Sequence, residues 1–129
     1  MRRQETAFQI VAAQYLDFAL PERGCIWTAV DAGGVKLTPE QGALRKRMGI
    51  KAGIPDLLIL WRGRLIGLEL KAPKGVVRQS QTDMGLAIIE AGGHWASCRS
   101  IEDIEAVLRS QGVPLKATAG TRFEPRRQA

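Results

Sequence analysis

The sequence predicts a single α/β domain whose mixed sheet of about four strands is flanked by helices, and three observations support this. Apolar residues recur at helical spacing in three segments, and short runs of β-forming residues lie between and beside them. Residues 57–61 are apolar at every position, which is typical of a strand covered on both faces. A chain of 129 residues, 45% of them hydrophobic, is long enough to bury a core of its own.

The amino-terminal part is expected to fold as a helix, a strand and a short helix. The apolar spacing predicts a helix over residues 4–20, which Pro21 ends, and a strand over residues 25–30 that leads into a glycine-containing turn. Thr38, Pro39 and Gln41 have the spacing of an N-cap, a first-turn proline and a capping-box partner. They predict a short helix that stops near residue 49.

The central part is expected to form a hairpin and a crossover helix. Residues 57–61 predict one strand, Arg62 and Gly63 the turn, and residues 64–71 the returning strand. Pro73 and Gly75 interrupt that strand. A helix follows over about residues 80–91, with its buried stripe expected at Met84, Ala87, Ile88 and Ala91.

The carboxyl-terminal part adds a strand, a helix and a tail. The strand is expected over residues 94–98, and Ser100 caps a last helix. The apolar stripe of that helix consists of Ile101, Ile104, Val107 and Leu108. Residues 112–129 show no periodicity, so we expect a domain over residues 1–111 and a basic, loosely ordered tail over residues 112–129.

Charge and composition narrow the class of function. The net charge is +6, with the excess of lysine and arginine in residues 1–51 and 112–129, which favours nucleic acid over an anionic membrane as partner. Cys25 and Cys98 lack metal-ligand spacing and are expected to be reduced thiols. Because His94 is the single histidine, a metal would be held mainly by oxygen. With no long apolar run and no signal peptide, we expect a soluble, cytoplasmic protein.

Polar residues occupy positions that should face the sheet. Glu5 and Gln9 align with the apolar stripe of the first helix, and Gln81 aligns with the stripe that contains Met84 and Ile88. These polar residues also suit the first turn of a helix, where the dipole favours acids, so that interpretation stays open.

The expected hairpin would bring two carboxylates together. Asp56 precedes one strand, whereas Glu69 and Lys71 share one side of the other strand. Two close carboxylates raise each other's pKa, and a hard divalent cation such as Mg²⁺ removes the repulsion. The alternative is a solvated pair between Glu69 and Lys71, with Asp56 as an ordinary residue at the start of a strand.

The spacing of these residues resembles a nuclease signature. Gly53-Ile-Pro-Asp56, twelve further residues and Glu69-Leu-Lys71 resemble the PD-(D/E)XK motif. Together with Glu5-Thr-Ala-Phe-Gln9, the Ala-Pro that follows Lys71, and Gln81 after a glycine-containing loop, they are similar to the virus-type replication-repair nuclease (VRR-NUC) family. The similarity extends from about residue 4 to residue 109.

The resemblance implies a restriction-endonuclease-like αβββαβ core and hydrolysis of DNA phosphodiesters that depends on Mg²⁺ or Mn²⁺. Asp56 and Glu69 would be metal ligands together with the backbone carbonyl of Leu70, and Lys71 would position or help deprotonate the attacking water. Glu5 would support a second metal or its water, and Gln81 would orient the site.

The resemblance also implies partners. Stand-alone members resemble Holliday-junction resolvases and are commonly homodimers, so we expect a homodimer acting on branched DNA such as four-way junctions, encoded by a bacterium or a phage. The indole residues Trp27, Trp61 and Trp95 are candidates for the dimer surface, or for the core. Phosphate contacts are expected from the basic residues Arg45, Lys46, Arg47, Lys51 and Lys74, which could also be merely solvated. The alternatives are a nucleic-acid-binding module that does not cut, and a less selective PD-(D/E)XK endonuclease.

Overall fold

The elements follow one another in the order αβαββαβα. The structure is a computed structural model and describes residues 2–30, 37–119 and 125, without the side chains of residues 2 and 3. Its helices and strands are α1 (Arg2–Ala19), β1 (Cys25–Ala29), α2 (Pro39–Arg47), β2 (Leu57–Trp61), β3 (Arg64–Leu70), α3 (Gln79–Glu90), β4 (His94–Cys98) and α4 (Ile101–Ser110).

The four strands form one mixed sheet in the order β1-β2-β3-β4. The β1–β2 and β2–β3 pairs are antiparallel, whereas β3 and β4 are parallel and are joined through α3. Arg62 and Gly63, both with positive φ, make the tight turn between β2 and β3. The predicted α/β class and the four-stranded mixed sheet are therefore confirmed.

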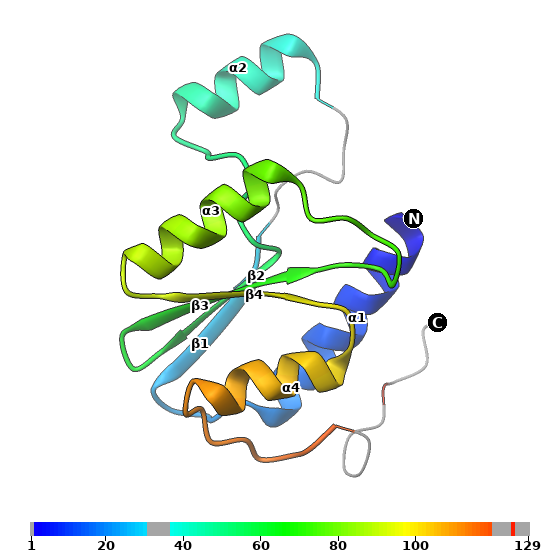
Figure 1. The fold of residues 1–129 in the computed structure, drawn as a ribbon, viewed down its shortest axis with the longest axis vertical. Coiled ribbons are helices and arrows are strands. Elements are labelled where there is room, and N and C mark those ends of the chain that lie inside the picture. Colours follow the sequence, from blue (N-terminus) through cyan, green and yellow to red (C-terminus); the bar gives the residue numbers. More distant parts are fainter. Residues whose placement is uncertain (1, 31–36, 120–124, 126–129) are drawn as a thin grey trace.

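Helices cover the two faces of the sheet unequally. Helices α1 and α4 lie on one face, and α3 lies on the other (Figure 1). The main core lies between the sheet and the first pair of helices, and its largest fully buried side chains include Tyr15, Leu16, Leu57, Ile59, Ile66, Leu68, Ile104 and Leu108. On the α3 side, the contacts run mainly to β3 and β4.

This unequal coverage corrects one prediction about β2. Leu57 and Ile59 are buried, but Leu60 is exposed and Leu58 is half-buried, so only one face of the strand is fully covered. Ile26, which pairs with Leu60 across the sheet, is also exposed. The physical reason is that α3 packs over the two strands that it connects and leaves the outer surface of β1 and β2 open.

Helix α3 buries only part of its predicted stripe, since Ile88 is buried as expected and Met84 is half-buried. Gly85 and Ile88 are buried, whereas Ala87 and Ala91 are exposed. A Cβ on Gly85 would overlap the indole ring of Trp95, so the glycine lets that ring lie directly against the helix. The close approach of helix and indole selects the buried stripe, which the apolar pattern alone could not reveal. The indoles of Trp27, Trp61 and Trp95 are all half-buried, and Trp27 and Trp61 pack against the core.

The segment after α4 packs more tightly than expected. Val113 and Ala117 belong to the core, and the backbone N–H of Lys116 donates a 2.8 Å hydrogen bond to the carbonyl of Ala19. The expectation of a loose tail from residue 112 onward is therefore wrong for residues 112–119, because these two small apolar side chains extend the core beyond α4. The remaining tail positions, apart from residue 125, lie outside the described residues.

Helix α2 differs from the other helices because none of its residues is buried. It stands away from the sheet and its flanking helices in Figure 1. Its predicted start is confirmed: Thr38 is the N-cap, Pro39 is the first helical residue, and Thr38 and Gln41 form the capping box. Among the helices of the described ranges, none is both long and apolar enough to cross a membrane.

Candidate active site

The hairpin places Asp56 and Glu69 at its open end. Leu57 pairs with Leu68 across the antiparallel strands, so Asp56, which precedes β2, lies opposite Glu69 of β3. The backbone N–H of Leu70 donates a 2.7 Å hydrogen bond to Oδ2 of Asp56. The backbone carbonyl of Asp56 in turn accepts a 2.9 Å hydrogen bond from the N–H of Val30. Asp56 is thus held by both neighbouring strands, and the predicted proximity of the two carboxylates is observed.

Lys71 extends the cluster on the same side. Its Nζ lies 3.5 Å from Oε2 of Glu69, and the two side chains are only 6% and 2% exposed. The backbone N–H of Lys71 donates to the carbonyl of Cys98, which anchors it beside β4. Burying an ion pair costs desolvation energy that the mutual attraction often fails to recover. The pair is therefore unlike a solvated surface pair and is better explained by chemistry than by stability.

Gln81 joins the cluster from α3. Its Nε2 donates a 2.8 Å hydrogen bond to Oε2 of Glu69, and its Oε1 accepts one of 2.8 Å from the backbone N–H of Arg78. A residue in the first turn of the helix therefore both caps the helix and holds a carboxylate of the sheet.

Gly53 brings the loop before Asp56 against the start of α3. Its φ is +79°, and a Cβ at this position would overlap the backbone carbonyl of Ser80. Only glycine tolerates both the left-handed backbone and this close approach. The contact joins the loop that leads to Asp56 to the start of the helix that carries Gln81.

The electrostatics of Glu69 follow from this crowding. Burial, followed by the neighbouring charge and hydrogen bonding of Asp56, raises the pKa of its carboxyl group, while Lys71 opposes the shift, and together they bring that pKa to about 8. Oε1 of Glu69 is buried and has no hydrogen-bond partner. A buried carboxylate thus lies beside a half-buried one, and the surrounding donors leave one oxygen of Glu69 unsatisfied.

This donor set fits a hard divalent cation. The unpartnered Oε1 of Glu69 and the mutual repulsion with Asp56 are both relieved by a positive ion. Within the described ranges no three His, Cys, Asp or Glu side chains come together as a metal-holding group. A cation at Asp56 and Glu69 would therefore take most of its ligands from other oxygens, as Mg²⁺ commonly does. The carbonyl of Leu70 as a ligand stays a prediction.

Glu5 lies beside the turn that follows Lys71. Its Oε2 is 3.2 Å from the point that a Cβ on Gly75 would occupy. None of the hydrogen bonds and ion pairs described for the resolved side chains joins Glu5 to Asp56, Glu69 or Lys71. Its predicted role in supporting a second metal or its water stays a prediction.

The predicted DNA-contacting residues fall into two places. Arg45, Lys46 and Arg47 form the last turn of α2, and Lys51 follows them; of these four side chains, three are exposed and that of Arg45 is half-buried. Lys74 is exposed in the turn that follows β3 and Lys71. The residues are accessible to a large polyanion, whereas contact with DNA stays a prediction.

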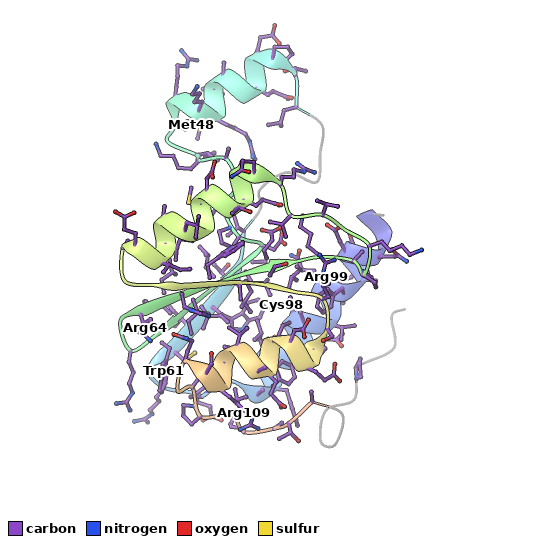
Figure 2. All side chains as sticks on the ribbon, in the orientation of Figure 1. Met48, Trp61, Arg64, Cys98, Arg99 and Arg109 are labelled. Atoms are coloured by element: carbon purple, nitrogen blue, oxygen red, sulfur yellow. The ribbon has the colours of Figure 1, made fainter. Side chains whose placement is uncertain are left out.

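Sequence reasoning missed two further residues near the site. Nη1 of Arg99 donates hydrogen bonds of 2.6 Å and 3.3 Å to the carbonyls of Ala72 and Pro73, so it holds the turn that follows Lys71 (Figure 2). Ser97 pairs with Glu69 across the parallel strands, and its Oγ is buried without a partner. The parallel register of β3 and β4 exposes these relationships, and no local sequence signal reports that register.

The mixed four-stranded sheet with helices on both faces defines an α/β fold in which Asp56, Glu69 and Lys71 lie together at one end of the sheet. A solved structure described as "VRR_NUC domain protein" is similar to this chain, with a TM-score of 0.56 over 82% of this chain and 85% of that chain. The sequence identity is 18%, so the similarity shows a shared fold. Scans of protein-family models and of curated proteins each found no match.

Proposed function

We propose that this chain is a metal-dependent DNA endonuclease that hydrolyses phosphodiester bonds. The observation that carries the proposal is the pairing of the half-buried Asp56 with the buried Glu69, whose Oε2 lies 3.5 Å from Nζ of Lys71. The nuclease-like fold supports it, because the similar solved structure carries the same arrangement of sheet and helices over most of its length.

In this proposal some residues bind the cation and others orient the carboxylates and the attacking water. Asp56 and Glu69 would hold Mg²⁺ or Mn²⁺ together with the carbonyl of Leu70, and Gln81 keeps Oε2 of Glu69 in position through its amide. When bound, the cation supplies Lewis acidity and makes a water more acidic. Lys71 orients the attacking water or stabilises negative charge that develops on the phosphate. Glu5 supports the site from α1.

The substrate in this proposal is branched DNA, in particular a four-way junction, and the working form is a homodimer. A junction needs two nicks to give separable duplexes, and a two-fold dimer supplies two active sites at a set spacing. Light scattering at micromolar concentration tests the dimer: twice the chain mass of 14.1 kDa supports it, and a single chain mass rejects it.

The experiment that tests the activity compares four substrates. Labelled four-way junction, flap, nicked duplex and linear duplex are incubated with the protein, with and without Mg²⁺ or Mn²⁺. We expect cleavage that requires the metal and is strongest on the junction. Equal cleavage of the junction and the linear duplex would indicate a less selective endonuclease, and binding without cleavage would indicate a non-cutting module.

A matched pair of variants separates the site from general charge effects. Glu69→Gln removes the carboxylate and should abolish cleavage and metal binding measured by calorimetry. Glu90→Gln removes an exposed carboxylate at the end of α3 and should leave both unchanged. Cleavage that persists in the Glu69→Gln protein would contradict the proposal.

A further inference from the structure

The segment of residues 37–52, here called the α2 arm, carries apolar side chains that nothing in the fold covers. Leu44, Met48 and Ile50 are exposed, and Met48 is the most exposed of them at 69%. Figure 1 shows the arm beyond the start of α3, and Figure 2 shows Met48 at the carboxyl end of its helix. Leu44 and Met48 are one helical turn apart and therefore lie on the same side of the arm, and exposed apolar side chains gathered on one side often mark a contact surface.

The helix of the α2 arm does not need a core to form. The hydroxyl of Thr38 accepts a 3.2 Å hydrogen bond from the N–H of Gln41, and Oε1 of Gln41 accepts one of 2.9 Å from the N–H of Thr38. Gly49, with a φ of +92°, follows the last turn and ends the helix. Local capping therefore specifies the helix, which leaves its apolar residues available for contacts outside the chain.

The positive charge of the α2 arm favours a negatively charged partner. Arg45, Lys46 and Arg47 are consecutive, Lys51 follows, and Glu40 is the single acid of the segment. Two such arms would repel each other, so a second copy of the same arm is a poor partner. A polyanion satisfies these cations, provided that it also offers apolar surface to Leu44, Met48 and Ile50.

DNA with an interrupted base stack offers both features. In a continuous duplex each base face is covered by its neighbour, and prising two base pairs apart costs a few kcal/mol per step. At a branch point base faces are already open, and phosphates crowd around them. We infer that the α2 arm packs its apolar side chains against the exposed base faces of branched DNA while its basic residues contact the flanking phosphates, an inference that rests on the proposed action on DNA.

The connection of the α2 arm to the active site gives the inference a consequence for cleavage. Residues 49–55 run from the arm to Asp56, and the backbone at Gly53 is packed against Ser80 at the start of α3. The base of the arm is therefore anchored next to Gln81. An arm seated at a branch would place the carboxylate pair at a constant distance from it, so that the structure of the DNA determines which bond is cut.

The test measures binding without cleavage. Fluorescence anisotropy in EDTA gives the affinity for a four-way junction and for a linear duplex with the same number of nucleotides, at one salt concentration. In the triple variant Leu44→Ala/Met48→Ala/Ile50→Ala, we expect the preference for the junction to fall about tenfold, because the apolar side chains that pack against open base faces are lost. The affinity for the duplex should change by less than about twofold, because the cations remain.

A control and a folding check accompany the variant. Ile26 on β1 is 69% exposed, equal to Met48, so Ile26→Ala removes a comparable apolar side chain outside the arm and should leave the preference unchanged. Alanine favours helix formation, so circular dichroism should show the fold intact. The single variant Met48→Ala should give a smaller loss in the same direction.

Three outcomes would overturn the inference. The first two are an unchanged preference for the junction in the triple variant and an equal loss of affinity for the junction and the duplex. The third is a change in the oligomeric mass of the triple variant in light scattering, which would show that the apolar side chains contact a second copy of the chain. Absence of metal-dependent cleavage by the unmodified protein, with the arm-dependent preference retained, would instead reject the proposed cleavage and support the inference about binding.

Discussion

The backbone N–H of Leu70 donates a 2.7 Å hydrogen bond to Oδ2 of Asp56, so β3 holds the carboxylate that introduces β2. Leu70 directly follows Glu69, so this short stretch of β3 supplies the carboxylate of Glu69 and also anchors that of Asp56. The geometry of the pair therefore depends on the hairpin register more than on either side chain alone.

The first prediction is that Glu69 lowers the stability of the metal-free protein but is needed for metal binding. Glu69→Gln removes a carboxylate whose burial beside Asp56 costs more than its attraction to Lys71 returns, as its pKa of about 8 indicates, so the melting temperature of the metal-free protein should rise by about 4 °C for each kcal/mol gained. Added Mg²⁺ should raise the melting temperature of the unmodified protein but not that of the variant. Differential scanning calorimetry measures both, and a lower melting temperature in the metal-free variant would contradict the prediction.

Lys71 should affect chemistry without affecting metal affinity. Lys71→Met keeps the apolar stem and removes the charge, and we expect the single-turnover cleavage rate to fall by about 10²–10³, as for other groups that stabilise developing charge. Titration calorimetry should still detect Mg²⁺ or Mn²⁺, because a lysine is not a ligand. Loss of metal binding in this variant would refute the assigned role.

Gly53→Ala should disturb both the fold and the site. The φ of +79° and the contact with Ser80 make any side chain strained, and we expect a loss of about 1–3 kcal/mol in the free energy of unfolding. Gly42→Ala is the matched control, since a Cβ at Gly42 within α2 meets no atom within 4 Å. Urea denaturation should show Gly42→Ala to be neutral or stabilising by about 0.5–1 kcal/mol.

The cations of the α2 arm should determine the salt dependence of DNA binding. Replacing Arg45, Lys46, Arg47 and Lys51 by glutamine should weaken binding to all DNA sequences similarly. The slope of log K against log salt should become less steep by about 0.9 for each lost phosphate contact. An unchanged slope in anisotropy titrations would mean that these residues are only solvated.

A pH prediction follows from Cys98. Burial, and to a smaller extent the charge of Asp103, raise the pKa of its thiol from 9.0 to about 12. The folded state therefore favours the neutral thiol, so this contribution to stability is complete below about pH 9 and is lost as the pH rises toward 12. Urea denaturation at pH 8 and pH 10 should show a larger loss of stability for the unmodified protein than for Cys98→Ala. Equal losses would refute this prediction.

Thiol labelling gives an independent check. Cys25 and Cys98 are both free, as expected, but Cys25 is only half-buried. A thiol reagent at pH 8 should therefore label Cys25 before Cys98 in the folded protein. Both thiols should react at the rate of a fully exposed cysteine only after the protein is unfolded. Faster labelling of Cys98 would contradict its burial.

Local signals in the sequence determined most of the secondary structure. The bounds of β2 and β4 agree with the predicted strands, and the Thr38 capping box and the cap at Ser100 occur as predicted. The proximity of Asp56 and Glu69 could also be predicted, because a hairpin with a two-residue turn has a set register and side-chain direction alternates along a strand. Each of these features depends on residues close together in the chain.

Only the tertiary structure decided what covers each surface and which distant groups meet. The bond between Gln81 and Glu69, the turn held by Arg99, the position of Ser97 beside Glu69 and the packing of Val113 depend on contacts between separate elements. A periodic pattern reports which side of an element is apolar, but not which element packs there or how closely. That is decided by close approaches such as Gly85 against Trp95, which place α3 over β3 and β4.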